Sequence, residues 1–283
     1  MDTMKQYYLS VVRLTQKGAP LQLPKEIRDK YNDKVKDFDK KSNDARNTNE
    51  PKRGNAENPD FDWLTAQKEY EDYISTKAFT NTEKGRKELR IAILVGLNVL
   101  QRPRRVSDYS SLQYFSKKPT EKEAEGRNIL YKDGDKIYFS IDVFKTRYRV
   151  SGQATEKKEL LPRYVKEVNG RLASLFMDFI KKLEIKNMSK LTPAEKRASK
   201  NYYIFHQEGN QEVGYTENTF SKVVATAFKV VFNNRKNLTV NTVRHIYNTW
   251  IAKHISEFND AKLHEIAVDV GDTPKNLPTN LRY

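Results

Sequence analysis

Three arginines, Arg102, Arg104 and Arg105, follow a segment of the chain that is apolar on nearly every side. Guanidinium groups on a rigid element offer fixed pairs of hydrogen-bond donors that match the oxygens of a phosphate. Runs of positive charge are also common on solvated protein surfaces. The residue types therefore suggest phosphate binding, with an ordinary basic surface as the alternative.

Two further groups of cations lie later in the chain. Lys145 and Arg147 stand at the end of a predicted strand, where a lysine is usually only a surface residue. Asn241 and Arg244 are three residues apart in a segment with helical apolar spacing, so they lie on one stripe beside the buried face. A charge that borders a core is normally paired, and a structural ion pair is the alternative for Arg244. For His245 we expect a hydrogen-bonded core side chain.

Several other chemistries have no motif in this sequence. It contains no Walker-type phosphate loop, no His-Glu-x-x-His and no nucleophile elbow. It also lacks a tight group of carboxylates of the kind that holds catalytic magnesium, so any action on nucleic acid would depend on cations and hydroxyls. The last residue, Tyr283, follows Gly271 and Asp272 in a polar segment, and a terminal tyrosine is normally only a frayed end.

The composition of the 283 residues limits the partners. Lys and Arg number 52 against 37 Asp and Glu, which gives a net charge of +15 and an isoelectric point near 9.6. Such an excess predicts a polyanionic partner, either nucleic acid or an anionic membrane surface. The absence of cysteine excludes disulfides and cysteine-based zinc sites, and fits an intracellular location. The sequence shows neither a run of about 18 apolar residues nor a secretory signal, so we expect no membrane span.

Hydrophobic periodicity predicts the elements that would position these residues. Three-and-four spacing predicts helices over 172–183, 220–231 and 240–254. The segment 84–100 is apolar on nearly every side within 89–100, which predicts a central buried helix. Further helices are expected near residues 7–14, after Pro24 from Lys25, and over 63–73. Alternation around a turn predicts strands over 128–131 and 136–144, with a third strand over 158–162. The sequence therefore predicts a mainly α protein with a small antiparallel β-sheet, in the α+β class.

The domain boundaries follow from the polar stretch at residues 34–60, whose only large apolar residues are Val35 and Phe38. Such a stretch buries too little surface to offset its chain entropy. We expect a short helical segment at 1–45, a polar linker at 46–60 and the main domain at 61–283.

The cationic groups, taken in order, resemble the catalytic domain of tyrosine recombinases, the integrase family, over about residues 80–283. Arg105 is followed by an acid three positions later and a leucine seven positions later, as in the first motif of that family. Phe144-Lys145-Thr146 resembles its lysine hairpin, and Val243-Arg244-His245 its second motif. Residues 263–272 and 281–283 are similar to the helix and the nucleophile segment that follow. Type IB topoisomerases share much of this set.

The resemblance implies a role for each matching residue. Tyr283 would attack a DNA phosphodiester and form a 3′-phosphotyrosyl link, while Arg105 and Arg244 stabilise the charge on the phosphoryl oxygens. Lys145 would protonate the leaving 5′-oxygen. Asn241 stands where the family usually has His or Lys, and can still donate a hydrogen bond to phosphate but cannot act as a general acid. Asp272 stands where the family has His or Trp, and could orient Tyr283 or act as its base.

The remaining predictions concern partners. By the resemblance, residues 1–45 would form a reduced, core-binding-like domain that clamps double-stranded DNA, on which the enzyme would act as a homotetramer, in a nucleus or in the context of a virus or mobile element. We expect neither a cofactor nor a metal. Further DNA contacts are expected from Arg102, Arg104, Arg147 and His245. Two alternatives remain at this stage: topoisomerase IB-like relaxation, and a DNA-binding protein on a catalytically decayed scaffold.

Overall fold

The computed structural model describes Tyr7, Tyr8, Ser10, Val11 and residues 24–47, 58–144, 162–207, 209–233 and 235–271. Contacts between Cα atoms separate the described N-terminal residues, up to 47, from the described residues 58–271.

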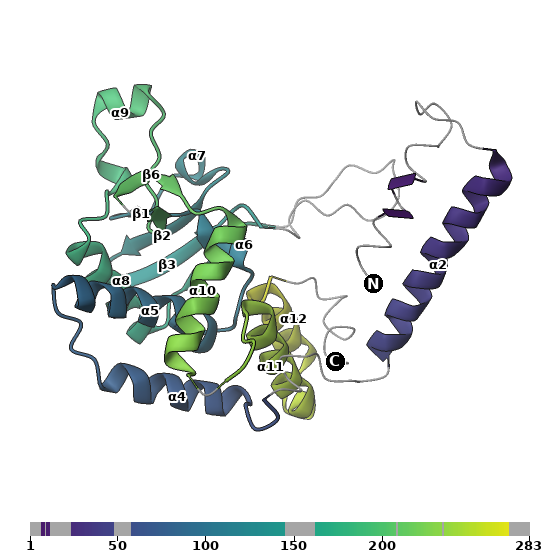
Figure 1. Cartoon of the computed structure of the whole chain (residues 1–283). Helices are drawn as coiled ribbons and strands as arrows, with labels where there is room; N and C mark the ends of the chain where they lie inside the picture. The colour runs from purple at the N-terminus through teal and green to yellow at the C-terminus, as the bar shows by residue number, and fades with distance from the viewer. Residues whose placement is uncertain are drawn as a thin grey trace. The chain divides into compact units, whose positions relative to one another are not determined.

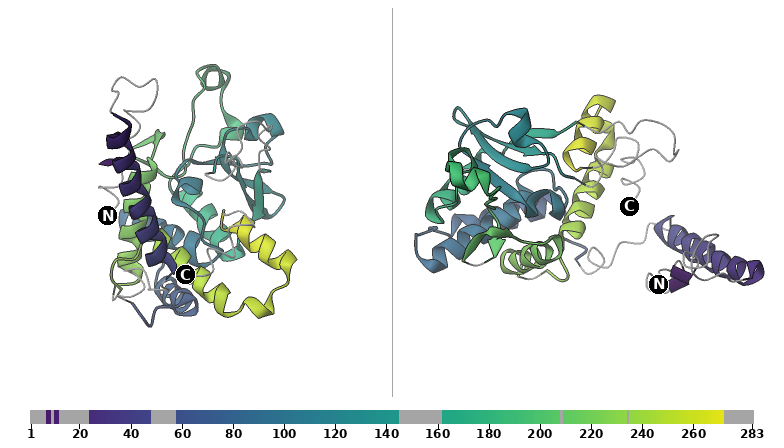
Figure 2. Two further views of the ribbon diagram at one scale, coloured as in Figure 1. Left: turned by 90° about the vertical axis from the view of Figure 1, so that its right-hand side faces the viewer. Right: turned by 90° about the horizontal axis from the view of Figure 1, so that it is seen from above.

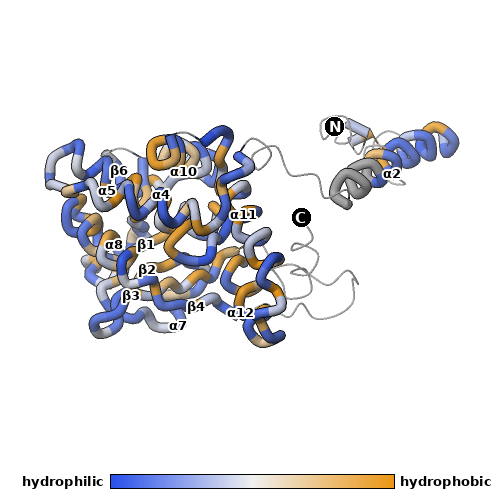
Figure 3. Tube along the Cα trace, turned by 90° about the horizontal axis from the view of Figure 1, so that it is seen from below, coloured by the Kyte–Doolittle hydropathy of each residue, from blue (hydrophilic) through white to orange (hydrophobic). Residues whose placement is uncertain are grey.

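The N-terminal unit contains the long helix α2 (Lys25–Asn47), which starts directly after Pro24. The backbone amide of Arg28 donates to the carbonyl of Pro24 at 3.1 Å, so proline stands at the helix start as predicted. The helix is mostly hydrophilic (Figure 3), and the ring of Tyr8 lies 5.6 Å from that of Tyr31 and 5.8 Å from that of Phe38. α2 extends two residues into the predicted linker, 46–60, and ends at Asn47.

A four-stranded sheet in the order β1-β2-β3-β4 lies in the second unit (Figure 1). Its strands are β1 (Leu112–Phe115), β2 (Asn128–Asp133), β3 (Lys136–Ile141) and β4 (Tyr164–Glu167). The β2–β3 hairpin is the one that the sequence predicted. Of the predicted third strand, 158–162, all but Pro162 lies outside the described residues, and β4 was not predicted. The sheet is mixed and not purely antiparallel, because β1 pairs parallel to β2. A separate two-stranded sheet joins β5 (His206–Gln207) and β6 (Asn210–Gly214).

Five longer helices build the core, and all five were predicted: α4 (Trp63–Ser75), α5 (Glu83–Val99), α8 (Gly170–Lys182), α10 (Glu217–Val231) and α11 (Val240–Lys253). α5 is the central one, with residues buried from Leu89 through Val99 on most sides. It contacts α4, α8 and α10, and α8 in turn contacts β3. Gly96 allows the close approach of α4, since a Cβ there would lie 2.7 Å from the hydroxyl oxygen of Tyr70.

The remaining elements of this unit are short: α6 (Val106–Ser110), α7 (Glu121–Ala124), η1 (Met188–Lys190), α9 (Pro193–Arg197), η2 (Ile255–Glu257) and α12 (Asp260–Asp269). In the right-hand view of Figure 2, α12 lies beside the sheet, and the ammonium of Lys166 on β4 donates to Glu265 on α12 at 3.0 Å. The class is α+β, as the sequence predicted.

Candidate active site

Arg105, Asn241 and Arg244 line one surface depression of about 460 Å³ in the second unit. Arg105 comes from the N-terminal end of α6, whereas Asn241 and Arg244 come from the first two turns of α11. Its other lining residues are Val106, Glu217, Asn218, Ser221, Thr239 and Val240. Arg105, which is more than a hundred positions from Asn241 and Arg244 in the chain, thus lies at the same depression as these two residues.

Helix α11 places its two polar residues through its cap and its apolar face. The hydroxyl of Thr239 accepts from the amide of Thr242 at 3.2 Å, which starts the helix at Val240. Val243 is fully buried against the core, so the neighbouring positions turn outward. Asn241 is consequently exposed, and Arg244 is half-buried on the flank of the buried face.

Arg244 also contacts the end of the next helix. Its Nη2 donates to the carbonyl oxygen of Val270 at 3.0 Å, directly after α12. The last carbonyls of a helix lack partners within the helix and carry partial negative charge, so a guanidinium there is favourable. The chain leaves α12 through Gly271, whose φ of +72° is a conformation that favours glycine.

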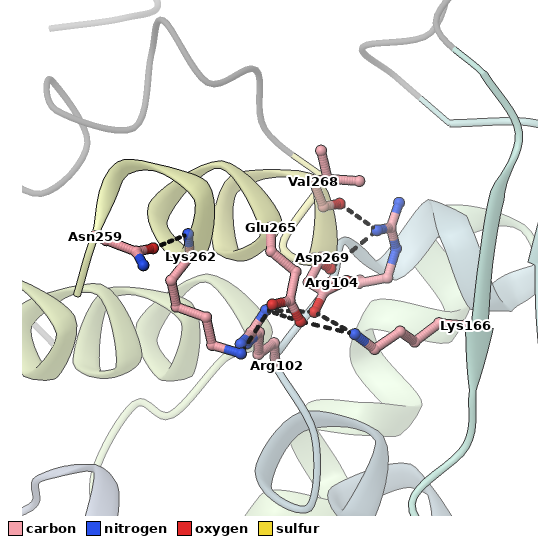
Figure 4. Close-up of polar contacts among 8 residues, drawn as sticks. All are labelled: Arg102, Arg104, Lys166, Asn259, Lys262, Glu265, Val268 and Asp269. Carbon is pink, nitrogen blue, oxygen red and sulfur yellow. Dashed lines mark hydrogen bonds and ion pairs between the residues drawn. The ribbon is translucent and has the colours of Figure 1, made fainter.

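Arg104 reaches the same helix end from inside the protein. Its side chain is 1% exposed, and Nη1 donates to the carbonyls of Val268 at 2.8 Å and Asp269 at 2.9 Å (Figure 4). Nε donates to Oδ2 of Asp108 on α6 at 2.8 Å. A side chain so enclosed cannot touch a duplex, so the expected DNA contact by Arg104 is wrong.

Arg102 belongs to a network of charges between α12 and β4 (Figure 4). Its Nη1 lies 2.5 Å from Oδ2 of Asp269 and 3.2 Å from Oε1 of Glu265. The ammonium of Lys166 lies 3.0 Å from Glu265, and that of Lys262 lies 2.8 Å from the same carboxylate. Hydrogen bonds from Lys262 and Lys166 lower the pKa of Glu265 to about 2. Arg102 is 20% exposed, and its charge is already engaged within the protein.

The other predicted residues divide into two groups. His245 is half-buried next to Arg244 and is not among the residues that line the depression. Lys145, Arg147, Asp272 and Tyr283 lie outside the described residues, so their expected roles remain predictions.

Glu217 and Ser221 line the depression and were missed by the sequence reasoning. They lie at i and i+4 on α10, hence on one side of that helix. Their spacing could have placed Glu217 and Ser221 on one side of α10. The sequence could not show that α10 packs against α6, which is more than a hundred residues earlier in the chain. Tyr164, whose ring centre lies 3.9 Å from Cζ of Arg104, was missed for the same reason.

No helix in the described part of the chain combines the length and the apolar character needed to cross a membrane. Among the same residues, no three His, Asp or Glu side chains are grouped as ligands for a metal ion. Comparisons of the chain with protein-family models, with curated proteins and with solved structures found no match.

Proposed function

We propose that this protein cleaves and rejoins DNA strands through a phosphotyrosyl intermediate, as an integrase-like recombinase of the tyrosine recombinase type. The observation that carries the proposal is the shared depression of Arg105, Asn241 and Arg244. A phosphoryl group undergoing attack gains negative charge on its oxygens, and two guanidinium groups fixed beforehand stabilise that charge. Asn241 adds an amide donor at the same hollow.

The proposed cleavage exchanges one phosphoester bond for another and therefore needs no cofactor. The phenolic oxygen of Tyr283 forms a bond to phosphorus, the bond from phosphorus to the 5′-oxygen breaks, and Lys145 gives a proton to that leaving oxygen. The phosphotyrosyl link conserves the energy of the phosphodiester, so a second DNA end can reverse the step. The roles of Lys145 and Tyr283 rest on the resemblance of their motifs, and Asp272 is assigned to orient the tyrosine or accept its proton.

The proposed substrate is double-stranded DNA, which agrees with the net charge of +15. Residues 1–45 would form the clamping domain, and a homotetramer would hold two recombination sites. The proposed setting is inside a cell, in a nucleus or with a virus or mobile element as the source of the DNA. The depression itself contains one carboxylate, that of Glu217, at the first turn of α10.

A nicked suicide duplex tests the proposal. After cleavage, the short fragment that carries the free 5′-hydroxyl dissociates, so rejoining is prevented and the covalent intermediate accumulates. We expect an adduct that migrates with protein on a denaturing gel and that Tyr283→Phe abolishes. An adduct that persists in Tyr283→Phe would reject the assigned nucleophile. DNA binding without any adduct from the wild type would favour the decayed scaffold, whereas relaxation of a supercoiled plasmid by monomers would favour topoisomerase activity.

A further inference from the structure

Arg104 joins two elements that both border the candidate site. One nitrogen of its guanidinium is bonded to Asp108 on α6 at 2.8 Å, and another is bonded to the carbonyls of Val268 and Asp269 at 2.8 and 2.9 Å. A planar guanidinium holds such partners at a fixed mutual angle. The start of α6 and the end of α12 are therefore held together through one side chain.

Aromatic rings and burial keep this guanidinium in one position. Cζ of Arg104 lies 3.9 Å from the ring centre of Tyr164 and 5.7 Å from that of Phe144. Burial disfavours the charged form, but the carboxylate of Asp108 more than compensates, so the pKa of Arg104 is raised above its usual value. An arginine guanidinium keeps its charge in proteins, so this buried site holds a cation that the carboxylate of Asp108 pairs.

Each of the two elements that Arg104 joins is linked to one arginine of the depression: α6 carries Arg105, and the end of α12 contacts Arg244. Arg105 is the next residue in the chain and the N-terminal cap of α6. Arg244 donates to Val270, the residue after the two carbonyls that Arg104 binds. A shift of α6 against α12 would therefore change the position of Arg105 relative to Arg244.

We infer that Arg104 is a positioning residue for strand cleavage: it sets the separation of the two phosphate-binding arginines without touching the phosphate. This role rests on the proposed function. It differs from a general contribution to folding, because loss of Arg104 should lower the cleavage rate beyond any loss of folded protein. A misplacement of about 1 Å at a reacting group costs on the order of a hundredfold in rate.

Arg235 offers a matched control in the same unit. Like Arg104 it is an arginine tied to two elements and a ring: it lies 2.7 Å from Asp60 and 2.5 Å from Glu69, and its Cζ lies 4.8 Å from the ring centre of Phe61. Arg235 is absent from the lining of the depression. Replacing it should reduce stability without moving Arg105 against Arg244.

The test compares Arg104→Ala, Arg104→Lys and Arg235→Ala at a temperature at which circular dichroism shows each to be folded. Single-turnover adduct formation on the suicide duplex and the Kd for an intact duplex are measured for each. We expect Arg104→Ala to form the adduct about a hundredfold more slowly, with little change in Kd, and Arg235→Ala to react at the wild-type rate. Arg104→Lys should remain slow, because an ammonium keeps the charge but lacks the planar fork.

The rate of adduct formation in the presence of added guanidinium ion distinguishes a positioning role of Arg104 from a purely structural one. Millimolar guanidinium chloride should restore part of the rate to Arg104→Ala and leave Arg235→Ala unchanged. If Arg104→Ala is unfolded at the assay temperature, Arg104→Lys carries the comparison. Equal adduct rates in wild type, Arg104→Lys and Arg235→Ala would overturn this inference alone. A wild type that forms no adduct would reject the proposed function and this inference with it.

Discussion

Arg104 and Arg244 donate hydrogen bonds to consecutive carbonyl groups at the C-terminal end of α12. Arg104 binds those of Val268 and Asp269, and Arg244 binds that of Val270 at 3.0 Å. Carbonyls at a helix end lack intrahelical partners, and two cations there satisfy both their hydrogen bonding and their partial charge. The end of α12, just before Gly271, is thus held by Arg244, which also lines the depression.

Replacing Arg244 by alanine should slow the proposed cleavage more than it weakens DNA binding. A donor that acts on the transition state is worth roughly 3 kcal/mol, which corresponds to at least about a hundredfold in rate. The rate of adduct formation under single-turnover conditions measures the effect. Arg197→Ala is the control, because Arg197 is exposed on α9 and does not line the depression. An equal loss of rate in both variants would show that only total charge matters.

Replacing Asn241 by histidine should introduce a pH dependence into the same reaction. The amide of Asn241 does not titrate, whereas an imidazole at this exposed position would be protonated below about pH 6.5. The N-terminal end of α11 and the neighbouring Arg244 both disfavour the imidazolium, so the midpoint should lie lower still. We expect Asn241→His to form the adduct faster as the pH falls through its midpoint. A pH profile of the same shape as that of the wild type would contradict a contact between this position and the phosphate.

The charges around Glu265 should stabilise the fold in a pH-dependent way. Hydrogen bonds from Lys262 and Lys166 hold the folded-state pKa of Glu265 at about 2, below its usual 4.5. The contribution is therefore complete above pH 4.5 and is lost as the pH falls from there toward 2. Because the side chain is 40% exposed, its size should be about 1 kcal/mol or less. Urea unfolding of wild type and Glu265→Gln should show a stability difference at pH 6 that shrinks toward pH 3; a difference independent of pH would refute this.

Replacing Gly271 by alanine should destabilise the second unit through both strain and crowding. A residue with a side chain pays about 1 kcal/mol at a positive φ such as +72°. The new Cβ would also lie 3.2 Å from Nη2 of Arg104 and 3.4 Å from Oδ2 of Asp108, which adds roughly another 1 kcal/mol.

Gly126→Ala separates these two effects. Gly126 has a φ of +68°, but no described atom lies within 4 Å of the Cβ position. Urea denaturation should therefore show a larger loss for Gly271→Ala than for Gly126→Ala. Equal losses would mean that Arg104 moves aside without cost.

Local patterns were sufficient for most of the fold. The helices α8, α10 and α11 bury residues at three-and-four spacing, and α5 is apolar on nearly every side. The β2–β3 hairpin has its turn at Gly134–Asp135, so each of these elements could be read from neighbouring residues. β1 could not, because Leu112–Phe115 pairs parallel to Asn128–Tyr131 across a connection that includes α7. A short apolar run after a helix does not indicate which strand it will join.

For the candidate site, the sequence by itself determined the residue types, their order and the excess of positive charge. The resemblance assigned the catalytic role to Arg105 and only a DNA contact to Arg104, but the residue types alone could not show which of these two adjacent arginines is buried. The tertiary structure made that distinction, since α12, Asp108 and Tyr164 enclose one guanidinium while the next residue, at the extended cap of α6, lines the depression. The physical reason is that a buried arginine needs partners from several elements, and only the folded chain brings those elements together.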